Sequence, residues 1–384
     1  MQSFTNFFFH YFRPEYRTAI AFLIAIGFNF YAIPVILRIA RAKRLFDVPD
    51  DRKLHKSSTP TLGGLGIYAT IVIVSLTLIN TCGMNGGGFS SNLSALPTII
   101  AGFTLIFFIG MKDDLLDISA KKKLIAEIVA LLILIVIGDV RLNNMQGMFG
   151  IHQLSYYVSL LLSLFAGIVI INAFNLIDGI DGLASSIAML GSLVFGSYFI
   201  SINEWEYAVL SFTILGAIIP FFLYNAFGKT NKIFMGDTGS LILGFAMTVL
   251  VFRFNELNAL TYIKPHFVAG PAFSFAVVFI PMFDTLRVFT VRVYRGGSPF
   301  KADRRHIHHI LLDLGFSHLR STLILVIFNV AIIAYAYYFN SLGNSTIVFS
   351  LVFFGVAMSV LAMLILRNRL MRLKTQLEET SKPV

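Results

Sequence analysis

The sequence predicts an all-α, polytopic integral membrane protein with about eleven transmembrane helices, its N-terminus outside and its C-terminus in the cytoplasm. Hydrophobic residues make up 57% and charged residues 13% of the chain, and the mean hydropathy is +0.79. This composition excludes an ordinary soluble domain. Apolar runs of about 20 residues, the length that a helix needs to cross the hydrocarbon core, recur along the whole sequence.

These apolar runs define the predicted spans in chain order. They lie near residues 18–37, 62–80, 95–111, 124–138, 155–172, 183–200, 206–226, 238–252, 268–290, 321–339 and 346–366. Two of them are atypical, because 124–138 is short and 238–252 begins inside a charged motif. We find no repeat, linker or soluble domain, so we expect residues 1–384 to form one integral membrane domain.

The distribution of lysine and arginine predicts the orientation. With the N-terminus outside, 25 of the 30 basic residues fall in the predicted cytoplasmic segments. These segments are loops 38–61, 111–123, 173–182, 227–237 and 287–320 and the basic tail 367–384. The basic residues flank membrane spans, which argues against a nucleic-acid partner. Cys82 is the only cysteine, so neither an internal disulfide nor a thiolate metal site is expected.

Acidic, amide and histidine clusters gather in the predicted cytoplasmic loops, and the facing segments carry almost none. A channel or a scaffold has no need for this one-sided arrangement. A site that holds a divalent metal and phosphates at the membrane surface requires such an arrangement. The clustering therefore predicts an enzyme whose active site is formed by the five loops.

Asp113, Asp114 and Asp117 follow the third span and precede three lysines. Three nearby anions repel one another, and the C-terminal end of a helix is a poor place for carboxylates. A divalent metal or a base that activates a phosphate would explain this placement. A solvated helix end neutralised by the lysines is the alternative.

Asn172, Asn175, Asp178 and Asp181 are spaced by three residues, and Gly179 follows Asp178 directly. One straight helix cannot direct all four at one ligand, because nine residues rotate the first and last to opposite faces. We therefore expect a helix that ends near Asp178 and a short loop that carries Asp181. An amide–carboxylate cap between helices is the structural alternative to a functional site.

Asp237 lies in the string FMGDTGS just before the eighth span. Its glycines permit close backbone approach, and Thr238 or Ser240 could cap the helix. Asp237 would supply the hard oxygen ligand that magnesium prefers, with phosphate favoured at the helix N-terminus. The alternative for Asp237 is a plain helix cap.

The longest cytoplasmic loop, 287–320, carries seven arginines and lysines together with His306, His308 and His309. No cysteine or nearby paired ligand completes a zinc site, so recognition of phosphate by arginine and imidazole fits better. A headgroup-binding loop is the alternative. Lys56, which precedes a Pro/Gly turn, is either a phosphate ligand or an ordinary membrane flank.

A cation- or proton-coupled transporter is the rival from another functional class. It predicts carboxylates near the middle of spans, at broken helices. Glu127 is the only acid well inside a predicted span, and Asp284 lies near the inner end of the ninth.

Taken in chain order, the strings DVPDDRKLH, PTLGG, DD-x-x-D, NAFNLIDGIDGLA, FMGDTGS and DRRHIHH resemble the polyprenyl-phosphate N-acetylhexosamine-1-phosphate transferase family. The resemblance implies transfer of HexNAc-1-phosphate from a UDP-sugar to undecaprenyl phosphate, with release of UMP and initiation of a cell-surface glycan. It implies Mg²⁺, or Mn²⁺, as cofactor and an active site on the cytoplasmic face of the bacterial inner membrane. The expected partners are the UDP-sugar, undecaprenyl phosphate, the bilayer and a second copy in a homodimer.

The resemblance also implies residue roles. The expected catalytic residues are Asp113, Asp114, Asp178 and Asp181. The expected metal ligands are Asp237 and Asp114. The expected substrate-binding residues are Lys56, Asn172, Asn175, Phe234, Arg292, Arg304, His306, His308 and His309. Among these, Asp181 is expected to contact the uracil and Phe234 to stack on it.

The string HIHH resembles the branch that uses UDP-N-acetylglucosamine. The branch that takes UDP-MurNAc-pentapeptide usually shows three consecutive histidines followed by an acid. Another UDP-HexNAc or UDP-MurNAc-pentapeptide stays open as the donor. One stretch departs from the family pattern: Asn225 is followed by AFGKTNK, which is about two residues longer than usual and lacks the family's proline. The reaction fits either direct attack by the lipid phosphate or a two-step route through a carboxylate.

Overall fold

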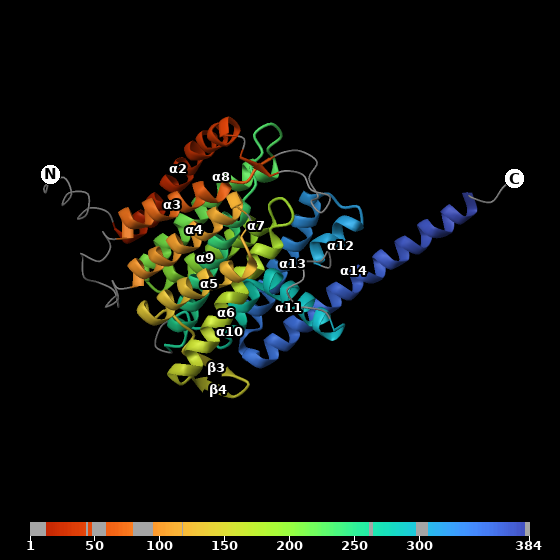
Figure 1. Cartoon of the computed structure of the whole chain (residues 1–384). Coiled ribbons are helices and arrows are strands. Elements are labelled where there is room, and N and C mark those ends of the chain that lie inside the picture. Colours follow the sequence, from red (N-terminus) through yellow and green to blue (C-terminus); the bar gives the residue numbers. More distant parts are fainter. Residues whose placement is uncertain are drawn as a thin grey trace.

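The computed structural model describes residues 13–43, 45–47, 59–79, 95–116, 118–260, 264–296 and 306–380. Within these ranges the chain is a bundle of long helices with two small hairpins (Figure 1). The helices up to the central one are α2 (Pro14–Lys43), α3 (Gly63–Ile79), α4 (Ala95–Leu116), α5 (Ala120–Leu132), α6 (Tyr156–Ile177), α7 (Leu183–Ser201), α8 (Trp205–Ala226) and α9 (Gly236–Asn258). The later ones are α10 (Gly270–Val277), α11 (Phe279–Tyr294), α12 (Ile307–Asp313), α13 (His318–Tyr338) and α14 (Asn344–Thr380).

The helices agree with the all-α membrane fold. In the described ranges, eight helices are long and apolar enough to cross a membrane, and the bent pair α10–α11 makes a ninth candidate. The two remaining predicted spans coincide with shorter helices. One is α3, of 17 residues, and the other is α5, which continues as the π-helical turn η2 (Ile133–Ile137).

Helix α9 is the central helix of the bundle, and nearly all of its side chains are buried. It packs against α3, α4, α6, α7 and α10. Its first residues therefore lie where several other helices end, so that a residue such as Asp237 is surrounded by side chains from distant parts of the sequence. The hydrophobic core runs along α9, with Phe103 and Phe245 in edge-to-face contact between α4 and α9.

The ninth predicted span is not one straight helix. Helices α10 and α11 are bent by 86° at Val278. The loop predicted over 287–320 is also partly helical, because α11 continues to Tyr294 and α12 forms before α13. The bend places Asp284 and Arg287 of α11 near the start of α12.

Four short strands, absent from the predicted elements, form two antiparallel pairs. One is β1 (Phe46–Asp47) with β2 (Thr59–Pro60), and the other is β3 (Asn144–Met148) with β4 (Ile151–Gln153). The backbone after β2 also binds the stretch before α9: Phe234 N donates to Pro60 O at 2.8 Å, and Gly63 N donates to Phe234 O at 3.0 Å. The PTLGG and FMGDTGS strings are therefore held together by backbone hydrogen bonds.

The bundle has two chemically different ends. The Asp237 end carries the C-terminal ends of α4 and α6 and the N-terminal ends of α5 and α9. The hairpin end carries β3–β4 (Figure 1), and there a buried Arg253 pairs with Glu256 at 3.0 Å and lies over the Tyr207 ring. The predicted site residues that the structure describes lie at the Asp237 end.

Candidate active site

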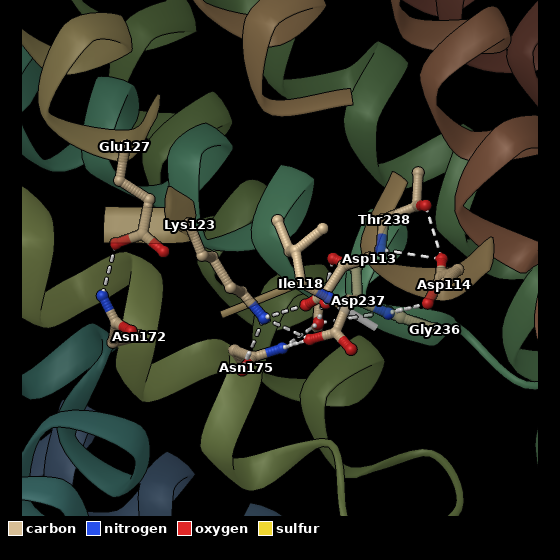
Figure 2. Close-up of polar contacts among 11 residues, drawn as sticks. Asp113, Asp114, Ile118, Lys123, Glu127, Asn172, Asn175, Gly236, Asp237 and Thr238 are labelled. Atoms are coloured by element: carbon tan, nitrogen blue, oxygen red, sulfur yellow. Dashed lines mark hydrogen bonds and ion pairs between the residues drawn. The ribbon is translucent and has the colours of Figure 1, made fainter. Parts of the chain in front are cut away.

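The start of α9 is capped by a carboxylate from another helix. Asp114, near the end of α4, accepts hydrogen bonds from Asp237 N at 2.7 Å, from Thr238 N at 3.0 Å and from Thr238 Oγ1 at 2.5 Å (Figure 2). The sequence suggested a cap from Thr238 or Ser240, and the structure assigns this role to Asp114. The two Asp114 oxygens thus fix the backbone of Asp237 and of Thr238.

This capping requires α4 and α9 to lie very close together. A Cβ atom on Gly110 would come within 2.5 Å of the Thr238 Cα atom, so no larger residue fits there. Gly236 has a φ of +70°, which glycine adopts without the strain that a side chain would add. Gly110 thus lets α4 and α9 approach closely, and Gly236 lets the backbone turn so that the Asp237 side chain contacts Asn175 of α6.

Lys123 lies at the centre of the acidic cluster (Figure 2). Its Nζ is 3.2 Å from Asp113 Oδ2 and 3.3 Å from Asn175 Oδ1, and it also pairs with Asp237 Oδ1. Asn175 in turn donates to the same Asp237 oxygen at 2.6 Å. Helices α4, α5, α6 and α9 thus contribute one side chain each to a single polar cluster.

The donor set of this cluster fits a divalent cation. Three oxygens, from Asp113, Asn175 and Asp237, already surround one positively charged atom, and carboxylate and amide oxygens are the ligands that Mg²⁺ prefers. Asp237 is the most accessible of the ion-paired side chains in this cluster, at 37% exposure. Among the described residues, no three acidic or histidine side chains are arranged so that they could hold a metal ion. In the acidic cluster, Lys123 lies between the carboxylates.

Asp178 adds a further carboxyl group beside this cluster. It follows the last residue of α6, so the helix ends where the sequence predicted, and Asp181 lies in the turn beyond. Burial, together with the charges of Asp237, Asp114 and Asp181, raises the pKa of Asp178 well above its ordinary value. Carboxylates that raise one another's pKa in this way mark a place where a cation is favoured.

Asp181 is held by side chains from two other segments. Lys232 Nζ is 2.6 Å from Asp181 Oδ2, and His318 Nδ1 is 3.5 Å from the same oxygen. The Lys232 ammonium also lies over the Phe234 ring, 5.4 Å from its centre. The two residues expected to contact the uracil are therefore neighbours, linked by Lys232.

Asn225 connects this turn to the stretch before α9. Its Oδ1 accepts from Gly182 N at 2.7 Å, and its Nδ2 donates to Ile233 O at 2.9 Å. On the other side, Arg41 of α2 donates to Thr230 O at 2.6 Å. The atypical stretch that follows Asn225 is thus anchored at both ends.

His306 is buried beside Asp284 and not beside the carboxylates around Lys123. Its Nδ1 is 2.9 Å from Asp284 Oδ2, and Arg287 donates to Asp284 Oδ1 at 2.7 Å. The Asp284 carboxylate also accepts from Ile307 N, the first residue of α12. Asp284 therefore fixes both His306 and the start of the helix that carries the other two histidines.

His308 packs against the turn after α6. It is 1% exposed, and neither ring nitrogen has a hydrogen-bond partner in the described structure. A Cβ atom on Gly179 would come within 2.7 Å of its Nε2. Burial and the neighbouring His309 lower the pKa of His308 to about 3, so its ring is neutral. His309 is the only one of the three that is partly exposed.

Asn172 lies deeper in the bundle, one turn of α6 before Asn175. Its Nδ2 donates to Glu127 Oε2 at 2.6 Å and to Ile168 O at 2.9 Å. Its amide is therefore oriented by α5 and by its own helix. Arg292 lies on α11, and Lys56 and Arg304 lie outside the described residues.

The structure adds residues to the site that the sequence did not single out. Lys123 was interpreted as one of three lysines that neutralise a helix end, and Lys232 and His318 carried no motif. A signal for Lys123 was present, because it lies four residues before Glu127, on the same face of α5.

Comparisons with known proteins identify relatives of this chain. Residues 96–255, which include Asp113, Lys123, Asn175 and Asp237, match the family described as glycosyl transferase family 4. An undecaprenyl-phosphate alpha-N-acetylglucosaminyl 1-phosphate transferase of Salmonella typhimurium is 32% identical over 82% of this chain and 80% of the relative. Its namesake in Escherichia coli O157:H7 is 28% identical over the same shares. A probable undecaprenyl-phosphate N-acetylglucosaminyl 1-phosphate transferase of Bacillus subtilis is 27% identical over 80% of this chain and 81% of the relative.

Proposed function

Because this chain belongs to the polyprenyl-phosphate N-acetylhexosamine-1-phosphate transferases, we propose that it transfers N-acetylglucosamine 1-phosphate from UDP-N-acetylglucosamine to undecaprenyl phosphate. The products are undecaprenyl-diphosphate-N-acetylglucosamine and UMP. The observation that carries the proposal is the cluster of Asp113, Lys123, Asn175 and Asp237 at the ends of four apolar helices. A lipid-anchored phosphate and a soluble diphosphate can meet at such a place.

The acidic cluster is suited to Mg²⁺ held by Asp237, with Asp113 and Asn175 beside it. A divalent ion bound there would neutralise diphosphate oxygens and the charge that develops on the leaving UMP. Lys123 contacts the same oxygens in the structure, so its ammonium and the ion would compete for them. Asp114 acts by positioning, since its oxygens are used to hold the α9 backbone.

The bonds that change are few. An oxygen of the lipid phosphate attacks the β-phosphorus of the donor, and the bond from that phosphorus to the UMP oxygen breaks. Asp178, which is not paired with Lys123, is the carboxylate that we assign to the proton of the lipid phosphate. We favour this direct attack over the two-step route.

The nucleoside end of the donor is assigned to the cluster of Asp181, Lys232 and Phe234. The aromatic face of Phe234 can stack on a base. The Asp181 carboxylate beside it can accept a hydrogen bond from the ring N–H of that base. His309, the partly exposed histidine, and Arg292 are the described residues that we assign to the diphosphate and sugar. Lys56 and Arg304 keep the phosphate-binding role that the sequence suggests.

We assign the Asp237 end of the bundle to the cytoplasmic face of a bacterial inner membrane, where UDP-sugars are made. The segments that connect helices at this end are rich in lysine and arginine, as the positive-inside rule requires. This orientation, the eleven spans and a homodimer are parts of the proposal.

A transfer assay tests the proposal. Purified protein would be mixed with undecaprenyl phosphate, Mg²⁺ and a panel of UDP-sugars, and both UMP and lipid-linked product would be measured. Mg²⁺-dependent product from UDP-N-acetylglucosamine is expected. Product from another UDP-HexNAc alone would keep the reaction and change the donor. Folded protein that releases no UMP from any donor would overturn the proposal.

A further inference from the structure

Glu127 is a buried acid that the proposed mechanism does not use. It is 1% exposed and lies on α5, about 10 Å deeper in the bundle than the start of that helix. Its Oε2 accepts from Asn172, whereas Oε1 is buried without a hydrogen-bond partner in the described structure. An unsatisfied carboxylate oxygen in this position is costly unless a positive charge can approach it.

Lys123 is the cation nearest in sequence that could reach it. The two residues are four apart on α5 and share one face of the helix, and Figure 2 shows both side chains on the side of α6. In the position observed, however, the Lys123 ammonium contacts Asp113, Asn175 and Asp237 and not Glu127.

A divalent ion and the Lys123 ammonium compete for the same oxygens. Asp237 Oδ1 is bound by Lys123 and by Asn175 Nδ2, so an ion on that oxygen would meet a like charge at contact distance. At such a distance the repulsion is strong in a site of low dielectric. The ammonium therefore has to leave these oxygens, and it needs another carboxylate within the reach of its side chain.

We propose that Glu127 is the counter-ion that receives Lys123 when a divalent cation binds Asp237. The lysine thus alternates between two carboxylate environments on one face of the bundle, at the acidic cluster or one helical turn deeper. This role rests on the proposed function, since that function supplies the divalent ion. It makes Glu127 a positioning residue that sets the affinity for the metal without touching it.

The test is metal binding, measured separately from catalysis. Mn²⁺ affinity of purified protein would be determined from the spin-resonance signal of free Mn²⁺, in detergent, for the wild type and for Glu127→Gln. Glutamine keeps the acceptor for Asn172 and removes the charge. We expect Glu127→Gln to weaken Mn²⁺ binding about tenfold, within the usual coupling of contacting charges. Unchanged Mn²⁺ affinity in the folded variant would overturn the proposal.

A double-mutant cycle separates charge exchange from packing. Lys123→Met removes the ammonium, so the further change Glu127→Gln should have no effect on Mn²⁺ affinity in that background. If Glu127→Gln weakens binding equally with and without Lys123, the exchange is refuted. Melting temperatures with Mn²⁺ and with a chelator give a second readout. The gain from Mn²⁺ should be smaller in Glu127→Gln than in the wild type.

Two controls complete the design. Glu256→Gln removes a partly buried, ion-paired acid at the hairpin end and should leave the Mn²⁺ affinity unchanged. Asp237→Asn should abolish tight Mn²⁺ binding. Absence of Mn²⁺ binding in the wild type would contradict both the exchange and the metal site of the proposed function. Normal wild-type binding with an insensitive Glu127→Gln would contradict the exchange alone.

Discussion

At the scale of single residues, His308 couples the stability of the protein to pH. The folded protein keeps the ring neutral, because burial lowers its pKa to about 3, whereas the unfolded chain takes up a proton below about pH 6.5. The stability that the neutral His308 ring contributes to the fold is therefore complete above pH 6.5 and is lost as the pH falls toward 3.

We expect the wild type to lose about 1 kcal/mol of unfolding free energy per pH unit below pH 6.5 through His308 alone. His308→Phe removes the titrating group and should lack this part of the acid dependence. Unfolding in detergent, followed at pH 7 and pH 5 in both proteins, measures the difference. Parallel pH profiles would show that His308 is protonated in the fold.

Gly179 and His308 form a pair that can be tested by suppression. Gly179→Ala places a Cβ atom against the imidazole and should displace the turn that carries Asp178 and Asp181. We expect at least about a tenfold loss of transfer activity, because small misplacements at a reacting centre are costly. His308→Ala makes room and should restore part of the activity to Gly179→Ala.

The control for the glycine pair is Gly27→Ala on α2. The space for an added Cβ is open there, with no atom of the described structure within 4 Å. Activity of the Gly27→Ala variant should match the wild type. If His308→Ala does not improve Gly179→Ala, the contact between them is not what makes the glycine necessary.

At the scale of elements, the junction of α4 and α9 determines where Asp237 lies. Asp114→Ala removes three hydrogen bonds to a carboxylate and should lower the unfolding free energy by about 2 kcal/mol, besides reducing activity. Asp114→Asn keeps one acceptor oxygen and should recover part of that stability. Thermal unfolding and the transfer assay check both expectations.

The exposed Asp313 on α12 provides a matched control, since Asp313→Ala should leave stability nearly unchanged. Equal stability of Asp114→Ala and the wild type would show that the capping bonds contribute nothing. A loss of activity without any loss of stability would instead favour direct participation of Asp114 in the chemistry.

The positions of the elements were largely predictable, because hydropathy over about 20 residues is a local property of the sequence. The predicted span 183–200, for instance, corresponds to α7. The bend at Val278 was not predicted, although Pro281 lies three residues later in the apolar run 268–290 and a proline favours the first turn of a new helix. The pairing of β1 with β2 depends on the distant contact of Pro60 with Phe234, which no local pattern reveals.

The candidate site was predictable to a similar degree. Motif strings identified Asp113, Asn175 and Asp237, which the structure brings into one cluster. They could not distinguish Asp114, whose oxygens cap α9, from Asp113, whose oxygens face Lys123. Nor could the string HIHH show that His306 is buried against Asp284, since that contact depends on how α11 packs beside α12.

At the scale of the whole molecule, the two ends of the bundle predict a labelling pattern. In a Cys82→Ser background, Phe149→Cys places an exposed thiol at the hairpin end and Lys229→Cys places one at the Asp237 end. A membrane-impermeant maleimide added to intact cells should label only Phe149→Cys. Lys229→Cys should react only after the cells are permeabilised. The reverse pattern would overturn the orientation and place the site outside.

The anchoring of the stretch after Asn225 bears on how such a chain tolerates change in evolution. Its added length lies between two fixed points, the Asn225 amide and the pair formed by Lys232 and Asp181. Insertions between these points lengthen an exposed bulge and leave Phe234 and Asp237 in place. Insertions and deletions within 226–231 should therefore have little effect on catalysis. A single insertion between Ile233 and Asp237 would displace the site and be eliminated by selection.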